Sequence, residues 1–248
     1  MFDDVSSVAL TSALRGLASR QRAIANNISN IETPGFHATR VTFEDSLREA
    51  VGSGDSGAVA DVAPSSRTSL EPTRQDGNNV NLDTETLSSV DTNLRYQARA
   101  ARRRPRVQRA AHVDADRLMP IFDAIGMAQS GAAVYRKWID AVSDNISNMN
   151  DVTSTSQAAY QAKSIEAGEM RGGGAQVVSV GLGSAEGRLV YQPDHPLADA
   201  KGYVRYPDID LGEQMGQAIM AQRGYQANLS AVDRARSAYE AALQVGKG

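Results

Sequence analysis

The sequence Asn27-Ile28-Ser29-Asn30 recurs 118 residues later as Asn145-Ile146-Ser147-Asn148. Each copy closes a long helical pattern near the start of its half of the chain. A second pair of landmarks, Tyr96-Gln97-Ala98 and Tyr225-Gln226-Ala227, recurs at an offset of 129. Because the landmarks keep their order, the repeat predicts two halves with one plan. Each half has an N-terminal helix, a variable middle and a C-terminal helix.

The helices are predicted from the spacing of their apolar residues, which fall alternately four and three positions apart on one narrow seam. In the first helix the seam residues are Leu10, Leu14, Leu17, Ile24 and Ile28. The 118-residue offset carries this seam to Val142 and Ile146. A third helix, predicted from about 209 to 244, has a seam that includes Tyr225, Leu229, Val232 and Tyr239. These residues are the candidate assembly seam.

Seams this narrow suit one or two partner helices rather than the core of a globule. Each buried Leu or Ile contributes roughly 1.5–3 kcal/mol, so a complete ladder supplies on the order of 10 kcal/mol. An isolated helix keeps almost none of this stabilisation. We therefore expect coiled-coil packing in which the terminal helices are buried only when neighbouring subunits polymerise.

The segments between the helices differ in composition. Proline and glycine in Thr33-Pro34-Gly35 are expected to end the first helix, and the second helix loses its pattern at 148–151. Residues 52–79 are rich in Gly, Ser, Asp and Pro, which predicts a disordered loop. Short β-type runs at 175–180 and 187–191 predict a small β-hairpin insertion over about 160–208. The predicted fold is mainly α, with long N- and C-terminal coiled-coil helices in each half.

Composition argues against several classes of function. No run of about 18 apolar residues exists, so direct membrane insertion is not expected. The chain has no cysteine, which excludes disulfides and thiolate sites. The three histidines lie far apart, and no carboxylates are paired with a base or a cleft. We therefore predict no enzyme activity, no metal and no cofactor.

The net charge of −3 hides an uneven distribution. Residues 1–98 carry −5, residues 99–118 carry +5, and residues 119–248 carry −3. Seven arginines within 99–118 could form a nucleic-acid patch, because several arginines on one strip release counterions from phosphates. No aromatic residues are interleaved with them. The pattern favours a solvated linker, and no nucleic-acid partner is expected.

Motifs in both halves carry a family resemblance. Ala25-Asn26-Asn27-Ile28-Ser29-Asn30, followed by Thr33-Pro34-Gly35-Phe36, resembles the N-terminal signature shared by bacterial flagellar rod, hook and other axial proteins. With Arg74-Gln75-Asp76-Gly77-Asn78-Asn79-Val80-Asn81-Leu82-Asp83 and the segment 94–98, residues 1–98 resemble FlgB-like proximal rod proteins. Residues 119–248 resemble FlgC-like proximal rod proteins through the segments 191–199, 201–207 and 221–228.

The chain departs from the FlgB-like pattern after Ala98. A FlgB-like protein would continue its C-terminal helix with an apolar seam, whereas here the sequence becomes Arg99-Ala100-Ala101-Arg102-Arg103-Arg104-Pro105-Arg106. The predicted organisation is a FlgB-like half, 1–98, with a truncated C-terminal helix, an Arg-rich junction, 99–118, and a FlgC-like half, 119–248. Our hypothesis is that a shifted reading frame joining two adjacent genes encodes the junction.

The resemblance implies a structural subunit of the proximal rod in the flagellar basal body, which polymerises through its terminal helices and transmits torque. Its implied partners are other rod subunits, basal-body ring and ring–rod adaptor proteins, and the flagellar type III export apparatus. Its implied location is the cell envelope and periplasmic space, reached by export without a cleaved signal peptide. The acidic start agrees with this implication, because it lacks the features of a Sec-type signal. The alternative is a cytoplasmic coiled-coil adaptor that binds partner helices.

Overall fold

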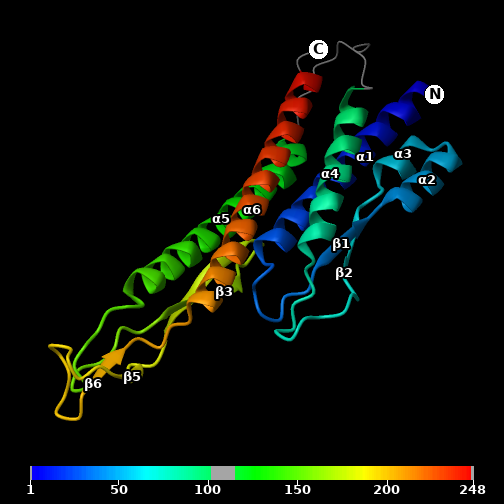
Figure 1. The fold of residues 1–248 in the computed structure, drawn as a ribbon. Helices are drawn as coiled ribbons and strands as arrows, with labels where there is room; N and C mark the ends of the chain where they lie inside the picture. Colours follow the sequence, from blue (N-terminus) through cyan, green and yellow to red (C-terminus); the bar gives the residue numbers. More distant parts are fainter. Residues whose placement is uncertain (1, 102–114, 247–248) are drawn as a thin grey trace. The chain divides into compact units, whose positions relative to one another are not determined.

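The computed structural model describes residues 2–101 and 115–246, and the chain is mainly helical (Figure 1). The chain folds into two compact units. The first takes its described residues from Met1–Gly131, Glu169–Ala175 and Ala227–Gly248, and the second from Ala132–Gly168 and Gln176–Gln226. The division does not follow the sequence repeat, because the first unit combines the first half with pieces of the second half.

Helix α1 (Phe2–Ser29) ends at the repeated motif, and Thr33-Pro34-Gly35 then turns the chain as predicted. Gly35 has φ +69°, a left-handed conformation that side chains disfavour. Its N–H donates to the carbonyl of Asp76 at 2.9 Å. The chain continues into strand β1 (Thr39–Thr42).

The prediction of a disordered loop at 52–79 is wrong for part of that range. Helix α2 (Glu44–Ser53) is followed by helix α3 (Ser56–Ala60) and by strand β2 (Ser65–Thr68), which pairs antiparallel with β1. Asp55 caps α3 by accepting from the N–H of Gly57 at 2.8 Å. Val59 is fully buried, and its carbonyl accepts from the hydroxyl of Ser12 at 2.8 Å. One buried valine, one cap and one strand pair order a segment whose composition is polar.

The core of the first unit lies along α1. Helix α4 (Leu82–Ala101) packs on α1, and Tyr96 of α4 joins the same buried cluster as Leu17, Ile24 and Ile28 of α1. The N-terminal part of helix α5 (Ala115–Asn148) and the C-terminal part of helix α6 (Leu211–Gly246) complete the cluster. They contribute small residues at 124, 128, 231, 235 and 238, all alanine.

Glycine allows three helices to approach closely at Gly131 of α5. A Cβ atom built on Gly131 would lie 2.7 Å from the Cα of Ser29 in α1 and would also contact the side-chain oxygen of Asn228 in α6. Real Cβ atoms do not come this close to backbone carbon. The absence of a side chain at this position therefore sets the spacing between α1 and α5.

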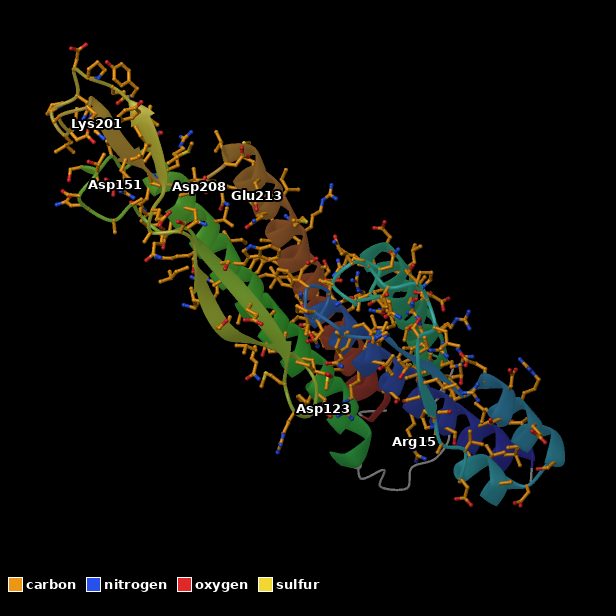
Figure 2. All side chains as sticks on the ribbon, turned by 90° about the horizontal axis from the view of Figure 1, so that it is seen from below. Arg15, Asp123, Asp151, Lys201, Asp208 and Glu213 are labelled. Atoms are coloured by element: carbon orange, nitrogen blue, oxygen red, sulfur yellow. The ribbon has the colours of Figure 1, made fainter. Side chains whose placement is uncertain are left out.

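The second unit contains the middle of the second half. Strand β3 (Lys163–Glu169) pairs with β4 (Ala175–Leu182), and β5 (Arg188–Tyr191) pairs antiparallel with β6 (Tyr203–Tyr206). Both predicted β-type runs are strands, in β4 and β5, and each pairs with a strand outside those runs. Figure 2 labels exposed charged side chains on this unit, among them Lys201 and Glu213.

The second predicted helix corresponds to α5, which ends at Asn148, where its pattern was predicted to stop. The third corresponds to α6, which begins at Leu211, two residues after its predicted start. Of the Arg-rich junction, 99–118, α4 covers 99–101 and α5 covers 115–118, while 102–114 lie outside the described residues. Among the described helices, none has a stretch apolar and long enough to span a bilayer.

Candidate assembly surface

Asn27 of the repeated motif joins α1 to β1. Its amide nitrogen donates to the carbonyl of Thr39 at 3.0 Å, and its amide oxygen accepts from the Thr39 N–H at 2.8 Å. A side-chain amide has the same donor and acceptor pair as a peptide group, so Asn27 binds the strand as a neighbouring strand would. Asn27 is fully buried, and these two hydrogen bonds offset the free energy that its amide loses on leaving water.

The second copy of the motif makes the same connection in the second unit. Asn145 donates to the carbonyl of Lys163 at 2.9 Å and accepts from the Lys163 N–H at 2.8 Å. It is 1% exposed and also accepts from Tyr160 and donates to Gln214. The motif therefore has one structural function in both halves, which is to fasten a strand to the end of a helix. The sequence pattern alone did not point to this strand contact.

Charge supports the first of these connections. Glu85 of α4 is fully buried, and its carboxylate lies 2.5 Å from the guanidinium of Arg40 in β1. Burial raises the pKa of Glu85 above 4.5, while hydrogen bonding to Asn27 and the charge of Arg40 act in the opposite direction. Arg40 also pairs with Glu71, at 3.2 Å. No sequence pattern pointed to this ion pair, because its members lie 45 residues apart.

The two motifs that carry the FlgB-like resemblance fold onto each other. Asn78 is fully buried and donates to the carbonyls of Asn30 and Thr33, at 2.9 and 2.8 Å. Asn79 accepts from the N–H of Ala38 at 2.7 Å and donates to the carbonyl of Ser69. These asparagines satisfy the backbone of the turn that follows α1, which explains why both motifs are rich in asparagine.

The predicted seam of α1 is already covered within the chain. Leu17, Ile24 and Ile28 are at most 4% exposed, while Leu10 and Leu14 are half-buried. The expectation that these side chains wait for a neighbouring subunit is therefore wrong for the central part of α1. The physical reason is that α4, α5 and α6 supply partner surfaces in the same molecule.

The seam of α6 is rotated by one residue from its predicted position. The buried positions are small or polar, and from Ala221 onward they repeat at alternating intervals of three and four. This small-residue row comprises Gln214, Ala221, Gly224, Asn228, Ala231, Ala235 and Ala238. Each predicted seam residue lies one position later. Tyr225, Val232 and Tyr239 are half-buried, and Leu229 is 42% exposed. In α5, Val142 is buried and Ile146 is half-buried.

Large apolar side chains remain exposed along α6. They form the α6 stripe, which consists of Leu211, Met215, Ile219 and Leu229. At 100° per residue, these four residues lie within about 80° of one another around the helix. Helix α4 has a second exposed row, spaced by three and four, at Leu87, Val90 and Leu94. Within the described residues, the predicted seam is therefore largely buried in α1 and only partly buried in α6. Most of the large apolar side chains that remain exposed on α4 and α6 form one row along each helix.

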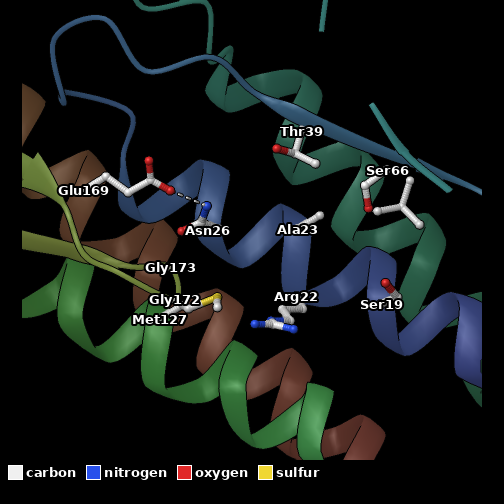
Figure 3. A pocket seen from close by; sticks show the side chains of 11 residues that line it. Ser19, Arg22, Ala23, Asn26, Thr39, Ser66, Met127, Glu169, Gly172 and Gly173 are labelled. Atoms are coloured by element: carbon white, nitrogen blue, oxygen red, sulfur yellow. Dashed lines mark hydrogen bonds between the residues drawn. The ribbon is translucent and has the colours of Figure 1, made fainter. Parts of the chain in front are cut away.

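A groove of about 380 Å³ lies beside α1 in the first unit (Figure 3). Asn26 and Arg22 of α1 line it, together with Met127 of α5 and with Gly172 and Gly173. In the residues that the structure describes, no group of three acidic or histidine side chains could hold a metal ion.

Comparison with known proteins agrees with these features. The sequence profile of the family described as "Flagella basal body rod protein" matches residues 9–37, which include the first copy of the motif. The flagellar basal-body rod protein FlgC of Salmonella typhimurium is 34% identical over 135 residues, which are 52% of this chain and 98% of that protein. The chain belongs to the flagellar basal-body rod protein family.

Rod proteins from other bacteria match over similar lengths. FlgC of Yersinia enterocolitica is 35% identical over 136 residues, which cover 98% of its length. FlgC of Bacillus subtilis is 28% identical over 151 residues and is covered completely. In each case the match takes up 52% of the present rod-family chain, so nearly half of it lies outside the alignment with FlgC.

Proposed function

We propose that this chain is a structural subunit of the flagellar proximal rod, which polymerises through its terminal helices and transmits torque through packed helices. The relationship to FlgC rod proteins carries this conclusion. The α6 stripe supports it, because a regular row of exposed Leu, Met and Ile on a long helix is suited to a partner helix. Contacts that repeat head to tail between unlike surfaces build helical filaments.

The chain joins a FlgB-like half, 1–98, to a FlgC-like half, 119–248. Residues 119–248 are 130 of 248, the same 52% share that each FlgC relative covers. The family profile matches inside the first half, and Asn27 and Asn145 make the same strand contact. Resequencing the locus tests the proposed frameshift origin of 99–118, since a clean single frame in independent isolates would refute it.

The partners of such a subunit are other rod subunits, the basal-body ring and ring–rod adaptor proteins, and the type III export apparatus that delivers it to the periplasmic space. Export without a cleaved signal peptide leaves the N-terminal sequence intact. N-terminal sequencing of the chain recovered from purified basal bodies checks this, because a processed N-terminus would contradict the proposed export route.

The experiment that tests assembly replaces one residue of the α6 stripe. Leu229→Asp places a charge where a partner helix would bury it, and we expect loss of incorporation into basal bodies and loss of motility. Met220→Asp is the matched control, because Met220 is similarly exposed, at 49% against 42%, and lies half a turn around the helix. Normal incorporation of Leu229→Asp, or equal loss in both variants, would refute the role of the stripe.

The second candidate is a cytoplasmic coiled-coil adaptor. The exposed row Leu87, Val90 and Leu94 on α4 favours it, because this row would also accept a partner helix. Cell fractionation separates the two functions. A rod subunit co-purifies with basal bodies, whereas an adaptor remains in the cytoplasmic fraction.

A further inference from the structure

Three consecutive glycines form a tight turn between β3 and β4. Their φ angles are +91° at Gly172, +101° at Gly173 and +93° at Gly174, values that other residues rarely adopt. This glycine turn belongs to the FlgC-like half of the sequence. It lies in the same compact unit as α1, which belongs to the FlgB-like half.

Two asparagines of α1 and its following turn bind the backbone of the glycine turn. The N–H of Gly174 donates to the side-chain oxygen of Asn26 at 2.6 Å, and Asn30 donates to the carbonyl of Gly174 at 3.0 Å. Asn26 also donates to Glu169 at 3.3 Å, as Figure 3 shows. Side-chain amides of the other half therefore bind both polar groups of Gly174, although its carbonyl also accepts from the N–H of Met170 in its own half at 3.0 Å. Asn30 is fully buried.

The glycine turn also fits the surface sterically. A Cβ atom on Gly173 would contact the methyl group of Met127 and lie 3.0 Å from the Asn26 side-chain oxygen. A Cβ atom on Gly172 would meet nothing within 4 Å. Both positions need glycine for their backbone conformation, but only at Gly173 would a Cβ atom also press on Met127 of its own half and on Asn26 of the other half.

The second copy of the motif does not offer the same surface. The position equivalent to Asn26 is Asp144, which pairs with Lys163 of its own half at 2.8 Å. The position equivalent to Asn30 is Asn148, which donates to the carbonyl of Asp144 at 2.8 Å, as Asn30 donates to the carbonyl of Asn26 at 3.0 Å. The two copies therefore differ chiefly at Asp144, whose carboxylate pairs with Lys163 instead of binding a glycine turn. The contact is therefore a property of the first half and not a general consequence of the repeated motif.

We propose that Asn26 and Asn30 form a docking site for the glycine turn, and that this site holds the FlgC-like half against the FlgB-like half as a separate partner. The covalent junction between the halves is then dispensable for their association. The proposal rests on the two-half organisation proposed above. The partner of this docking site is a turn of consecutive glycines, whose peptide groups form hydrogen bonds with the side-chain amides of Asn26 and Asn30.

The test uses the full chain with a specific protease site inserted between the halves, cleaved to completion as judged on a denaturing gel. We expect the two fragments to co-elute in native size-exclusion chromatography over a dilution series. Asn26→Ala should raise their dissociation constant about tenfold, the effect of losing one or two hydrogen bonds. Asp144→Ala is the matched control, and it should leave the dissociation constant within about twofold of that of the unsubstituted cleaved chain.

A second pair of variants keeps the test independent of the asparagines. Gly172→Ala and Gly173→Ala both place a side chain on left-handed backbone, but only the Cβ atom at Gly173 would lie 3.0 Å from the Asn26 side-chain oxygen of the other half. A larger dissociation constant for Gly173→Ala than for Gly172→Ala therefore supports docking at Asn26. Separation of the unsubstituted fragments, or equal dissociation constants for the two glycine variants, would overturn the proposal. Incorporation of the uncleaved chain into basal bodies is scored separately, so failure of docking is distinguishable from failure of the rod function.

Discussion

Replacing Gly131 by alanine inserts one methyl group where α1, α5 and α6 come closest. The new Cβ would lie 2.7 Å from the Cα of Ser29, whereas carbon atoms pack at about 3.5–4.0 Å. Because the obstacle in α1 is backbone, the helix itself has to move by about 1 Å. Overpacking of this kind costs about 1–3 kcal/mol. Alanine recovers about 0.5–1 kcal/mol in a helix relative to glycine, so a net loss of up to about 2.5 kcal/mol is expected.

Gly126→Ala in the same helix provides the control. A Cβ atom at Gly126 would meet nothing within 4 Å, so only the helix-propensity gain of about 0.5–1 kcal/mol remains. For a chain of this length, 1 kcal/mol corresponds to about 2–4 °C in Tm. The helix-propensity gain is the same in both variants, so they differ by the overpacking cost of about 1–3 kcal/mol. Thermal unfolding followed by circular dichroism at the helical band should therefore place Gly131→Ala about 2–12 °C below Gly126→Ala.

The relative shifts decide whether three helices meet at Gly131. If Gly131→Ala melts as high as Gly126→Ala, α1 does not approach α5 as closely as described, and the packing argument is refuted. If both variants are destabilised equally, the loss belongs to α5 alone and not to contact with α1.

Three further predictions follow from the same structure. Burial raises the pKa of Glu85, so just above pH 4.5 the folded chain holds a proton that the unfolded chain has lost. The contribution of Glu85 to the free energy of unfolding therefore falls as pH rises through that region. In urea titrations between pH 4 and 7, the free energy of unfolding of Glu85→Gln should fall less with pH than that of the parent chain. Asn27→Ala should lower the free energy of unfolding by about 1–3 kcal/mol, since it leaves the Thr39 peptide groups unpaired, whereas Asn148→Ala should change it by less than about 0.5 kcal/mol in the same urea titration. Val59→Ala should destabilise α3 by roughly 1.5 kcal/mol and accelerate limited proteolysis within 52–64; an unchanged cleavage rate would show that α3 is not anchored by Val59.

Spacing and composition were sufficient to predict the helices. Regular apolar intervals predicted α1, α5 and α6, and Thr33-Pro34-Gly35 and the polar run after Asn148 predicted where two of them end. These features are local, because periodicity and backbone restrictions act over a few residues. The quoted motifs were also sufficient to indicate the rod-protein family.

The packing face of α6 could not be predicted in this way. Counting apolar residues selects Leu229 and Tyr225, but the structure buries Asn228 and Gly224 instead. Helices that approach closely bury small residues, and whether they do so depends on the partner surface. Gly131 of α5 forms part of that partner surface, because it lies against Asn228 of α6. The sequence of α6 alone does not indicate this contact.

The sequence by itself determined the long helices with their ends and indicated the family, because periodicity and turn residues act through neighbouring positions. The two-half plan stays a prediction from the repeat. Only the tertiary structure decided which helix faces are buried, how Asn27 and Asn145 fasten their strands, and that Asn26 and Asn30 bind the glycine turn. Those outcomes depend on distances between residues remote in the chain. A side-chain amide has no preferred partner until folding brings an unpaired peptide group within hydrogen-bond reach.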